Sequence, residues 1–279
     1  MTTLASFKKE AIEILSAYSA SARLDVDYLL SEYTNIALSQ LALHSELKLT
    51  TAQLQKLNQA IKKRSLGEPI AYIIGHWGFW KYDFLVNKHT LIPRPDTEIL
   101  IEQILDIFSN EIPLKVLDLG TGTGIIPICL AKERENWDFT AIDISANALE
   151  IAKKNAAKHK THIKFYQSDW LDALPNEDFF DLIISNPPYI KKSSVYLKEP
   201  SIKFEPQSAL IGGEIGTEML EKIIYQASSR LYPQGYLILE SASWQTNFIK
   251  QHMELAKFQY IGAIKDYGNN FRVSIGRLT

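Results

Sequence analysis

The stretch Asp118-Leu119-Gly120-Thr121-Gly122-Thr123-Gly124 lies between an apolar run that begins at Lys115 and a helix-forming segment, residues 125–133. Glycine lets the backbone turn tightly and approach a ligand closely at the N-terminus of a helix. The stretch therefore predicts a strand, a tight turn with a ligand, and a helix. Its spacing is G-x-G-x-G, not the G-x-G-x-x-G of dinucleotide-binding folds, and nothing resembles the Walker lysine, which argues against nucleoside triphosphate hydrolysis.

Strands and helices alternate after this point, which predicts an α/β fold with a parallel sheet and crossover helices. The last two predicted strands, residues 258–264 and 271–275, are joined by so short a turn that they must be antiparallel. The other predicted strands are residues 115–119, 139–142, 163–166, 182–184 and 236–239, and the helices are residues 125–133, 146–159 and 217–231.

The first third of the chain predicts a small helical bundle. Apolar residues recur at three- and four-residue spacing in residues 4–20 and 22–33. A later helix opens at Thr50, and Gln53 three residues on completes the pattern of a capping box. We expect the bundle at residues 1–75.

Aromatic and β-branched residues with two interior glycines predict a short hairpin within residues 70–86. We place a hairpin linker at residues 76–90 and a larger α/β domain at residues 91–279. We expect the aromatic side chains to pack the hairpin between the two domains, with contact to a partner as the alternative. They are Trp77, Phe79, Trp80, Tyr82 and Phe84.

The composition excludes several classes of protein. Lys+Arg 30 against Asp+Glu 32 leaves a net charge of −2, so no global basic field favours bulk nucleic-acid binding. The single cysteine, Cys129, excludes an internal disulfide and a thiolate metal cluster, and its apolar surroundings predict burial. The six histidines form no metal-ligand set. No apolar run approaches the ~20 residues of a membrane span, and no signal peptide is visible at the start. We expect a cytoplasmic protein with no bound metal.

Polar groups follow two further predicted strands. Asp143 comes about twenty residues after the glycine loop, where a carboxylate can accept hydrogen bonds from ribose hydroxyls. Ser168-Asp169-Trp170 offers a polar group and a flat ring that suits adenine. A capping aspartate and a core tryptophan are the plain alternatives, but ligand-binding features at successive strand ends together predict one site.

Asn186-Pro187-Pro188-Tyr189 follows the apolar run 182–184 directly. Neither proline can donate to a sheet ladder, so the chain must leave the sheet at the carboxyl end of a strand, where open α/β folds bind ligands. This stiff loop presents one amide side chain, free carbonyl groups and an aromatic face. It suits a flat amide or amine, whereas a simple proline turn would leave the tyrosine and its context unexplained.

The combination of D-L-G-T-G-T-G, Asp143 and N-P-P-Y resembles the S-adenosylmethionine-dependent methyltransferases, whose seven-stranded sheet ends in an antiparallel hairpin. Within them, N-P-P-Y marks enzymes that methylate a planar nitrogen. Three further segments resemble the HemK/PrmC family, which methylates the Gly-Gly-Gln glutamine of peptide chain release factors. They are G-E-P-I-A-Y-I-I-G at residues 67–75, L-I-P-R-P-D-T-E at residues 91–98 and E-P-Q-S-A-L-I-G-G at residues 205–213.

The resemblance implies a role for each matching residue. Gly120, Thr121, Gly122, Thr123 and Gly124 would line the methionine part of S-adenosylmethionine, Asp143 the ribose and Trp170 the adenine. Asn186, Pro187, Pro188 and Tyr189 would hold the substrate glutamine, with Asn186 also beside the cofactor. The implied partners are class I release factors met by a monomer without direct nucleic-acid contact.

This chain departs from the family pattern at two places. Asp96 stands where glutamate is usual, and Ser241-Ala242 replaces isoleucine-glycine, with Gln245 retained. From the residues alone, Asp96 or Thr97 is expected to cap a helix over residues 98–108.

An amide nitrogen is a poor nucleophile, and the loop offers no base, so the expected mechanism is positioning by hydrogen bonds. Asn186 Oδ1 and the Pro187 carbonyl would accept the two N–H groups of the glutamine, with Tyr189 against the amide plane. Three alternatives stay open: a nucleic-acid amine methyltransferase, a ribosomal-protein glutamine methyltransferase and a non-enzymatic cofactor sensor. The first lacks a basic track and a target-recognition domain, and the last leaves N-P-P-Y unexplained.

Overall fold

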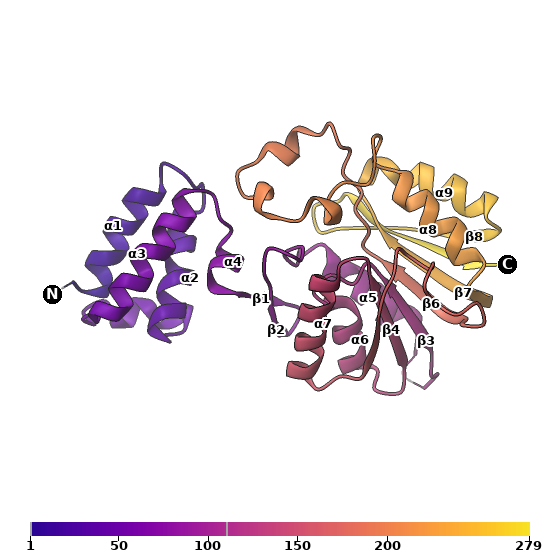
Figure 1. Ribbon diagram of the computed structural model, residues 1–279, viewed down its shortest axis with the longest axis horizontal. Coiled ribbons are helices and arrows are strands. Elements are labelled where there is room, and N and C mark those ends of the chain that lie inside the picture. Colours follow the sequence, from indigo (N-terminus) through magenta and orange to yellow (C-terminus); the bar gives the residue numbers. More distant parts are fainter. Residues whose placement is uncertain (1, 110) are drawn as a thin grey trace. The chain divides into compact units, whose positions relative to one another are not determined.

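The computed structural model describes residues 2–109 and 111–279. The chain divides into two compact units (Figure 1). The first holds the chain up to His76 together with Lys198–Phe204, and the second holds Trp77–Leu197 and Glu205–Thr279. We describe each unit by itself, and the second contains every residue of the site considered below.

The first unit is helical, as the apolar spacing predicts. Its helices are α1 (Leu4–Leu15), α2 (Ala22–Thr34), the 3-10 helix η1 (Leu38–His44), α3 (Thr51–Ser65) and α4 (Ile70–Ile74). The capping box before α3 is confirmed, because the Gln53 amide donates to Thr50 Oγ1 at 3.2 Å and the Thr50 amide donates to Gln53 Oε1 at 2.9 Å.

The predicted helix over residues 4–20 is too long, since α1 ends at Leu15. The Ser16 hydroxyl donates to the Ile12 carbonyl, and the Ser19 and Ser21 hydroxyls donate to the Asp25 carboxylate. Serine side chains of this kind compete with the helical ladder, so they favour a turn.

A short helix precedes the hairpin strands, which begin at His76. Residues Ile70–Ile74 form α4, after Pro69 and before Gly75, which adopts a left-handed φ of 82° and closes the helix. The strands are β1 (His76–Phe79) and β2 (Tyr82–Leu85). Helix-terminating residues on both sides therefore outweighed the β-branched composition.

Four of the five hairpin aromatics pack on the core of the second unit. Phe79 and Phe84 are buried in the core of the second unit, and Trp80 and Tyr82 pack against that core. The rings of Phe79 and Phe84 meet edge-on, with their centroids 6.3 Å apart. The hairpin therefore anchors to the larger unit through its side chains.

The second unit contains a seven-stranded sheet in the order β5-β4-β3-β6-β7-β9-β8. Strand β9 runs antiparallel to both neighbours, while β3 to β7 are parallel, which confirms the predicted α/β fold with an antiparallel last strand. The strands are β3 (Lys115–Leu119), β4 (Asp138–Asp143), β5 (Ile163–Gln167), β6 (Phe180–Ser185), β7 (Leu231–Glu240), β8 (Phe258–Lys265) and β9 (Phe271–Leu278).

Helices cover both faces of the sheet (Figure 1). One core joins the first face to α5 (Thr97–Ile107), α6 (Ile125–Glu133) and α7 (Ala146–His159). The other joins the second face to α8 (Glu218–Ser228) and α9 (Thr246–Leu255). Sequence reasoning did not predict α9.

The central strand β6 shows why its sequence reads as an uninterrupted apolar run. Leu182 and Ile184 belong to the first core and Ile183 to the second, so successive side chains are buried on opposite faces. Cys129 on α6 is buried in the first core, as expected, and burial raises the pKa of its thiol.

Strands β3, β4 and β6 end at the same edge of the sheet. Leu119 lies opposite Ile142 on one side and opposite Ser185 on the other. The Ser185 hydroxyl donates to the Leu119 carbonyl at 2.7 Å, which holds the two strand ends level. The loops that follow these strands are therefore neighbours, and they form the site.

Candidate active site

The glycine loop, residues 120–124, turns from β3 into α6 with a positive φ at each glycine: 73° at Gly120, 55° at Gly122 and 80° at Gly124. Only glycine adopts this region without strain, so the local sequence dictates the turn. The Gly120 and Thr121 amides both donate to the Ile142 carbonyl at 2.9 Å, which ties the loop to the end of β4.

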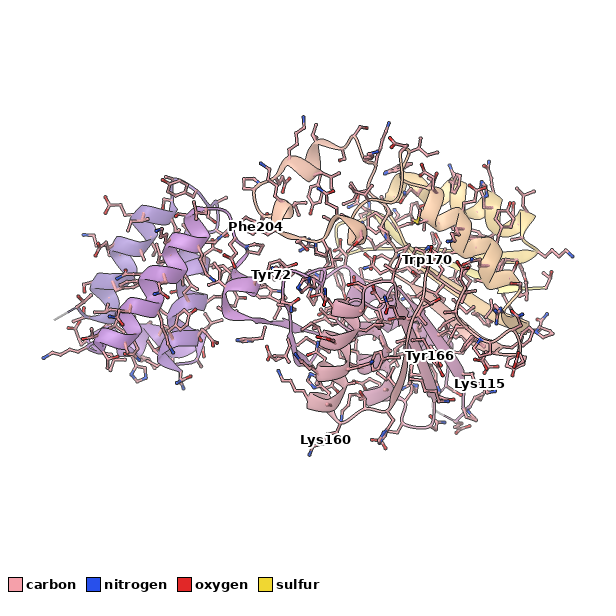
Figure 2. The ribbon with its side chains drawn as sticks, in the orientation of Figure 1. Tyr72, Lys115, Lys160, Tyr166, Trp170 and Phe204 are labelled. Carbon is pink, nitrogen blue, oxygen red and sulfur yellow. The ribbon has the colours of Figure 1, made fainter. Side chains whose placement is uncertain are left out.

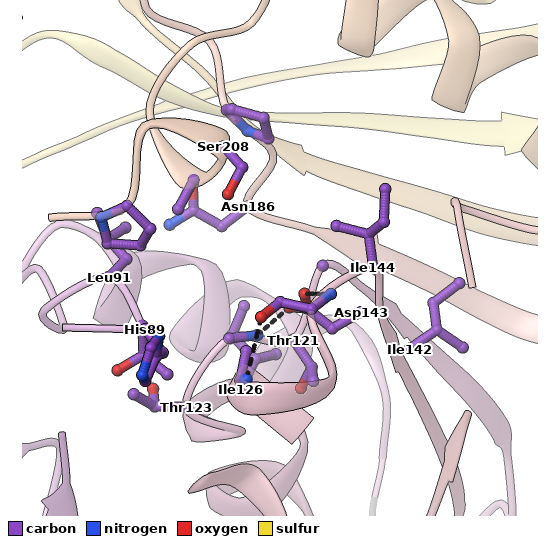
Figure 3. Close-up of a pocket in the computed structure, with 18 of the residues that line it drawn as sticks. His89, Leu91, Thr121, Thr123, Ile126, Ile142, Asp143, Ile144, Asn186 and Ser208 are labelled. Carbon is purple, nitrogen blue, oxygen red and sulfur yellow. Dashed lines mark hydrogen bonds between the residues drawn. The ribbon is translucent and has the colours of Figure 1, made fainter. Parts of the chain in front are cut away.

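Asp143 closes the loop from the side. Its carboxylate accepts the Gly122 amide at 2.9 Å and the Ser145 amide at 2.8 Å (Figure 3). Burial raises the pKa of Asp143 above its ordinary value, and the hydrogen bonds from the two backbone amides offset part of this rise. Each carboxylate oxygen has a further lone pair, so this clamp leaves acceptor positions for a ligand hydroxyl.

A cavity of about 350 Å³ opens over the glycine loop and Asp143. Figure 3 shows Asp143 and Thr121 below it, with Asn186 and Ser208 above. Four residues of the glycine loop line the cavity, and Gly124 does not. The other sequence-predicted residues in its wall are Asp143, Trp170, Asn186 and Pro188.

Trp170, labelled in Figure 2, stands in the turn after β5 and has a left-handed φ of 53°. A methyl group built on Gly120 would meet its ring at 3.7 Å, so the absence of a side chain at Gly120 leaves room beside the ring. Ser168 and Asp169 line the same part of the cavity.

A buried carboxyl group lies directly before the glycine loop that lines this cavity. The Asp118 carboxyl is buried, and the neighbouring Thr121 hydroxyl, which lines the cavity, acts to lower its pKa. Burial, with the nearby Asp143 charge, raises the pKa of Asp118 to about 7. Buried carboxyl groups of this kind suit a ligand that carries positive charge, as the cofactor's ammonium and sulfonium do.

The Asn-Pro-Pro-Tyr loop, residues 186–189, leaves β6 at the carboxyl end, as predicted. Asn186 Nδ2 donates to Thr97 Oγ1 at 3.0 Å, and the Tyr189 hydroxyl donates to Glu240 Oε1 at 3.3 Å. Gln245 Nε2 donates to the Tyr189 carbonyl at 3.1 Å. Side chains from three distant parts of the chain therefore hold this loop.

The expected helix cap before α5 is wrong. Asp96 occupies the capping position, but its side chain makes no capping hydrogen bond. It lies 3.1 Å from Arg272 instead, while the Thr97 hydroxyl accepts the bond from Asn186. Both side chains bind partners that are distant in the sequence, Arg272 and Asn186, so a local sequence pattern could not predict these contacts.

The Ser241-Ala242 departure leaves the neighbouring contacts of Gln245 in place. The Ala242 amide donates to Gln245 Oε1 at 2.9 Å, and Gln245 Nε2 also donates to the Gly216 carbonyl at 2.6 Å. The fully buried Gln245 is thus bonded at both ends of its amide.

A second cavity, of about 720 Å³, lies on the other side of Asn186. It is lined by Pro187, Tyr189, Glu240, Trp244 and Arg272, among others. The two cavities share four lining residues, Leu91, Arg94, Asn186 and Ala209. Asn186 is the member of the Asn-Pro-Pro-Tyr loop that faces both.

Arg94 and Glu205 join two segments that form the walls of these cavities. Arg94 Nη2 lies 2.5 Å from Glu205 Oε1, and the Ile92 amide donates to Glu205 Oε2 at 3.1 Å. Glu205 is buried, so the ion pair is a rigid link between residues 91–98 and 205–213. Residue-level reasoning assigned neither segment to the site, and only their likeness to a family singled them out.

Sequence reasoning also missed Thr97, Glu240 and Arg272 as parts of the site. Glu240 had a usable signal, because a polar group directly after a predicted apolar strand marks the ligand-binding edge of such a sheet. Within residues 2–109 and 111–279, no three histidine, cysteine, aspartate or glutamate side chains are grouped so as to hold a metal ion. No helix in the same ranges has the length and apolar character to cross a membrane.

Two family models match the chain: "PrmC N-terminal domain" over residues 8–75 and "Methyltransferase small domain" over residues 95–199. The release factor glutamine methyltransferase of Pasteurella multocida is 40% identical over 89% of this chain and 88% of its own length. The enzyme of that name from Escherichia coli is 38% identical over 96% of both chains.

A solved methyltransferase from Pyrococcus furiosus shares the fold, with a TM-score of 0.53 and 20% identity over 82% of this chain and 98% of its own. The glycine loop, the cavity that suits a cationic cofactor and the similarity over nearly the whole chain lead to one assignment. The chain belongs to the family of S-adenosylmethionine-dependent release factor glutamine methyltransferases.

Proposed function

We propose that this protein transfers a methyl group from S-adenosylmethionine to the side-chain amide nitrogen of the glutamine in the Gly-Gly-Gln motif of peptide chain release factors. The observation that carries the proposal is the place of Asn186, which faces the cofactor cavity on one side and a second, larger cavity on the other. A planar amide held by Asn186 from the second cavity would direct its nitrogen toward the first.

The cofactor would be held by residues of the first cavity. The glycine loop and Thr121 would take its methionine part, Asp143 its ribose and Trp170 its adenine. When bound, S-adenosylmethionine supplies an electrophilic methyl group on a sulfonium.

The protein's own task is to position the substrate nitrogen. An amide nitrogen is a weak nucleophile because its lone pair is delocalised into the carbonyl group. Asn186 Oδ1 and the Pro187 carbonyl would accept its two N–H groups, which turns the lone pair toward the cofactor cavity and favours a pyramidal nitrogen. Tyr189 would pack against the amide plane.

No base takes part in this mechanism. The carboxyl groups that line the second cavity are Asp96 and Glu240. Asp96 is paired with Arg272, and Glu240 accepts the Tyr189 hydroxyl. The proton of the substrate nitrogen would leave after methyl transfer, when that nitrogen has become acidic.

We further propose that the enzyme acts as a monomer in the cytoplasm and contacts its protein partner without nucleic acid. The near-neutral net charge and the single buried cysteine support this view. Methylation of a nucleic-acid amine or of a ribosomal-protein glutamine are the competing outcomes of the experiment.

The experiment mixes the protein with S-adenosylmethionine carrying a labelled methyl group and with a release factor whose motif is Gly-Gly-Gln or Gly-Gly-Ala. We expect label on the first release factor and none on the second. Ribosomal protein, RNA and DNA serve as competing acceptors in parallel reactions. Label on both release factors, or only on one of the competing acceptors, would overturn the proposal.

A further inference from the structure

A chain of buried polar groups lies behind Asn186. Thr97, the first residue of α5, accepts the Asn186 Nδ2 hydrogen bond at 3.0 Å and is 1% exposed. Glu240, the last residue of β7, is also 1% exposed and accepts the Tyr189 hydroxyl at 3.3 Å. Each end of the Asn-Pro-Pro-Tyr loop is therefore held by a buried polar side chain from another element.

The direction of these hydrogen bonds matters for the amide of Asn186. A threonine hydroxyl can accept a hydrogen bond as well as donate one, whereas an amide NH₂ group only donates. Because Thr97 Oγ1 accepts from Nδ2 of Asn186, the Oδ1 of Asn186 points away from that contact.

We propose that Thr97 and Glu240 are positioning residues: Thr97 fixes the Asn186 amide so that Oδ1, and not the NH₂ group, meets the substrate nitrogen, and Glu240 holds the Tyr189 end of the same loop. This inference rests on the proposed function, because it concerns how Asn186 grips an N–H donor. A flipped Asn186 would present two hydrogens to the substrate amide and could not accept from it.

Other groups around Glu240 hold the carboxyl in place. Arg272 supplies positive charge to it, and Asp96 supplies negative charge. Arg272 is itself bonded to Asp266 at 2.9 Å and to Asp96 at 3.1 Å. The carboxyl thus accepts a phenol from the Asn-Pro-Pro-Tyr loop and lies in the field of a guanidinium from β9.

The first test replaces Thr97. Thr97→Val removes the acceptor while preserving the shape, and we expect single-turnover methyl transfer to fall about 10- to 100-fold, because misdirected reacting groups cost rates of this order. The KM for the release factor should stay within about threefold. Thr97→Ser, which keeps the hydroxyl, should recover most of the rate.

A matched control removes another buried threonine hydroxyl from the same unit. Thr140 on β4 is 8% exposed and lines neither cavity. Thr140→Val should leave methyl transfer within about twofold of wild type. Equal losses in Thr97→Val and Thr140→Val would assign the effect to general destabilisation and overturn the proposal.

The second test is a double-mutant cycle. If Thr97 acts through Asn186, Thr97→Val should reduce the rate no further once Asn186→Ala is present. A role in packing alone would reduce the rate by the same factor in both backgrounds. Additive losses would therefore contradict the inference.

A third measurement does not depend on the substrate. In ¹⁵N-labelled protein with its cofactor, one Nδ2 hydrogen of Asn186 should exchange slowly with solvent because Thr97 accepts it. Thr97→Val should lose that protection, while Thr97→Ser keeps it. An unprotected amide in the wild type overturns the inference even if release factor is methylated. Protection without methylation refutes the proposed function instead.

Discussion

The two halves of the site are built in different ways. In the cofactor half, Asp143 bonds to residues 2 and 21 positions away, within one strand-turn-helix repeat. In the substrate half, Asn186 bonds to a residue 89 positions away, and Tyr189 bonds to residues 51 and 56 positions away. The first half is therefore assembled locally, whereas the second exists only once the sheet is complete.

This difference predicts that mutations will separate the two halves. Changes in the Asn-Pro-Pro-Tyr loop should affect methyl transfer and leave cofactor binding nearly intact. Changes around the glycine loop should do the reverse.

The largest effect is expected from Asn186→Ala. It should reduce single-turnover methylation of a Gly-Gly-Gln release factor by about 10²–10³, the cost of losing one hydrogen-bond partner that acts in the transition state. The affinity for S-adenosylmethionine, measured by calorimetry, should change far less. Activity within a few-fold of wild type would show that Asn186 does not hold the substrate.

Asp143→Ala tests the other half. We expect S-adenosylmethionine to bind more weakly by about 1–3 kcal/mol, because the charged hydrogen bonds to the ligand and to the Gly122 amide are lost together. With saturating cofactor, the rate of methyl transfer should recover. An unchanged dissociation constant would contradict the proposal that Asp143 binds the ribose of the cofactor.

Glu240→Gln probes the long-range half through stability. Burial raises the pKa of Glu240 from 4.5 to about 7, so the folded protein holds a proton that the unfolded chain releases between these values. The contribution of Glu240 to stability is therefore complete below about pH 4.5 and is lost as pH rises through about 7. Relative to wild type, Glu240→Gln should gain stability on the order of 1–3 kcal/mol across that window in denaturant titrations. A constant difference at all pH values would contradict the burial argument.

The smallest expected effect is a proton release in the cofactor half. The pKa of Asp118 is raised to about 7, so near pH 7 the carboxyl is partly protonated. A cationic cofactor nearby should lower that pKa, and binding should release a fraction of one proton. Calorimetry of S-adenosylmethionine binding in buffers of different ionisation enthalpy measures this release. Asp118→Asn should abolish it, and an unchanged release in that variant would assign the proton to another group.

Sequence patterns were informative where contacts are local. Residue type and a place directly after an apolar strand predict three features of the site: the glycine loop, Asp143 and the Asn-Pro-Pro-Tyr loop. The same local logic correctly predicts the capping box at Thr50. Each of these features depends on neighbours within about one supersecondary unit.

Local patterns failed where a distant hydrogen-bond or ion-pair partner, or a helix-terminating residue, determines the local structure. Asp96 and Thr97 resemble helix-capping residues. The side chain of Asp96 instead pairs with Arg272, and the hydroxyl of Thr97 accepts from Asn186. Residues 70–74 look like strand, but Pro69 and Gly75 bound a helix. The pairing of Arg94 with Glu205 joins residues 111 positions apart, and no periodicity could reveal it.

The sequence by itself determined the α/β fold, the glycine loop and the loop that we propose grips a planar nitrogen, because backbone restrictions of glycine and proline act on the residues where they stand. The tertiary structure alone decided that Asn186 faces two cavities, that Thr97 accepts from its amide and that Glu240 accepts from Tyr189. These contacts form only when α5, β6 and β7 meet at one edge of the sheet, since a hydrogen bond requires groups within about 3 Å and sequence distance does not report that.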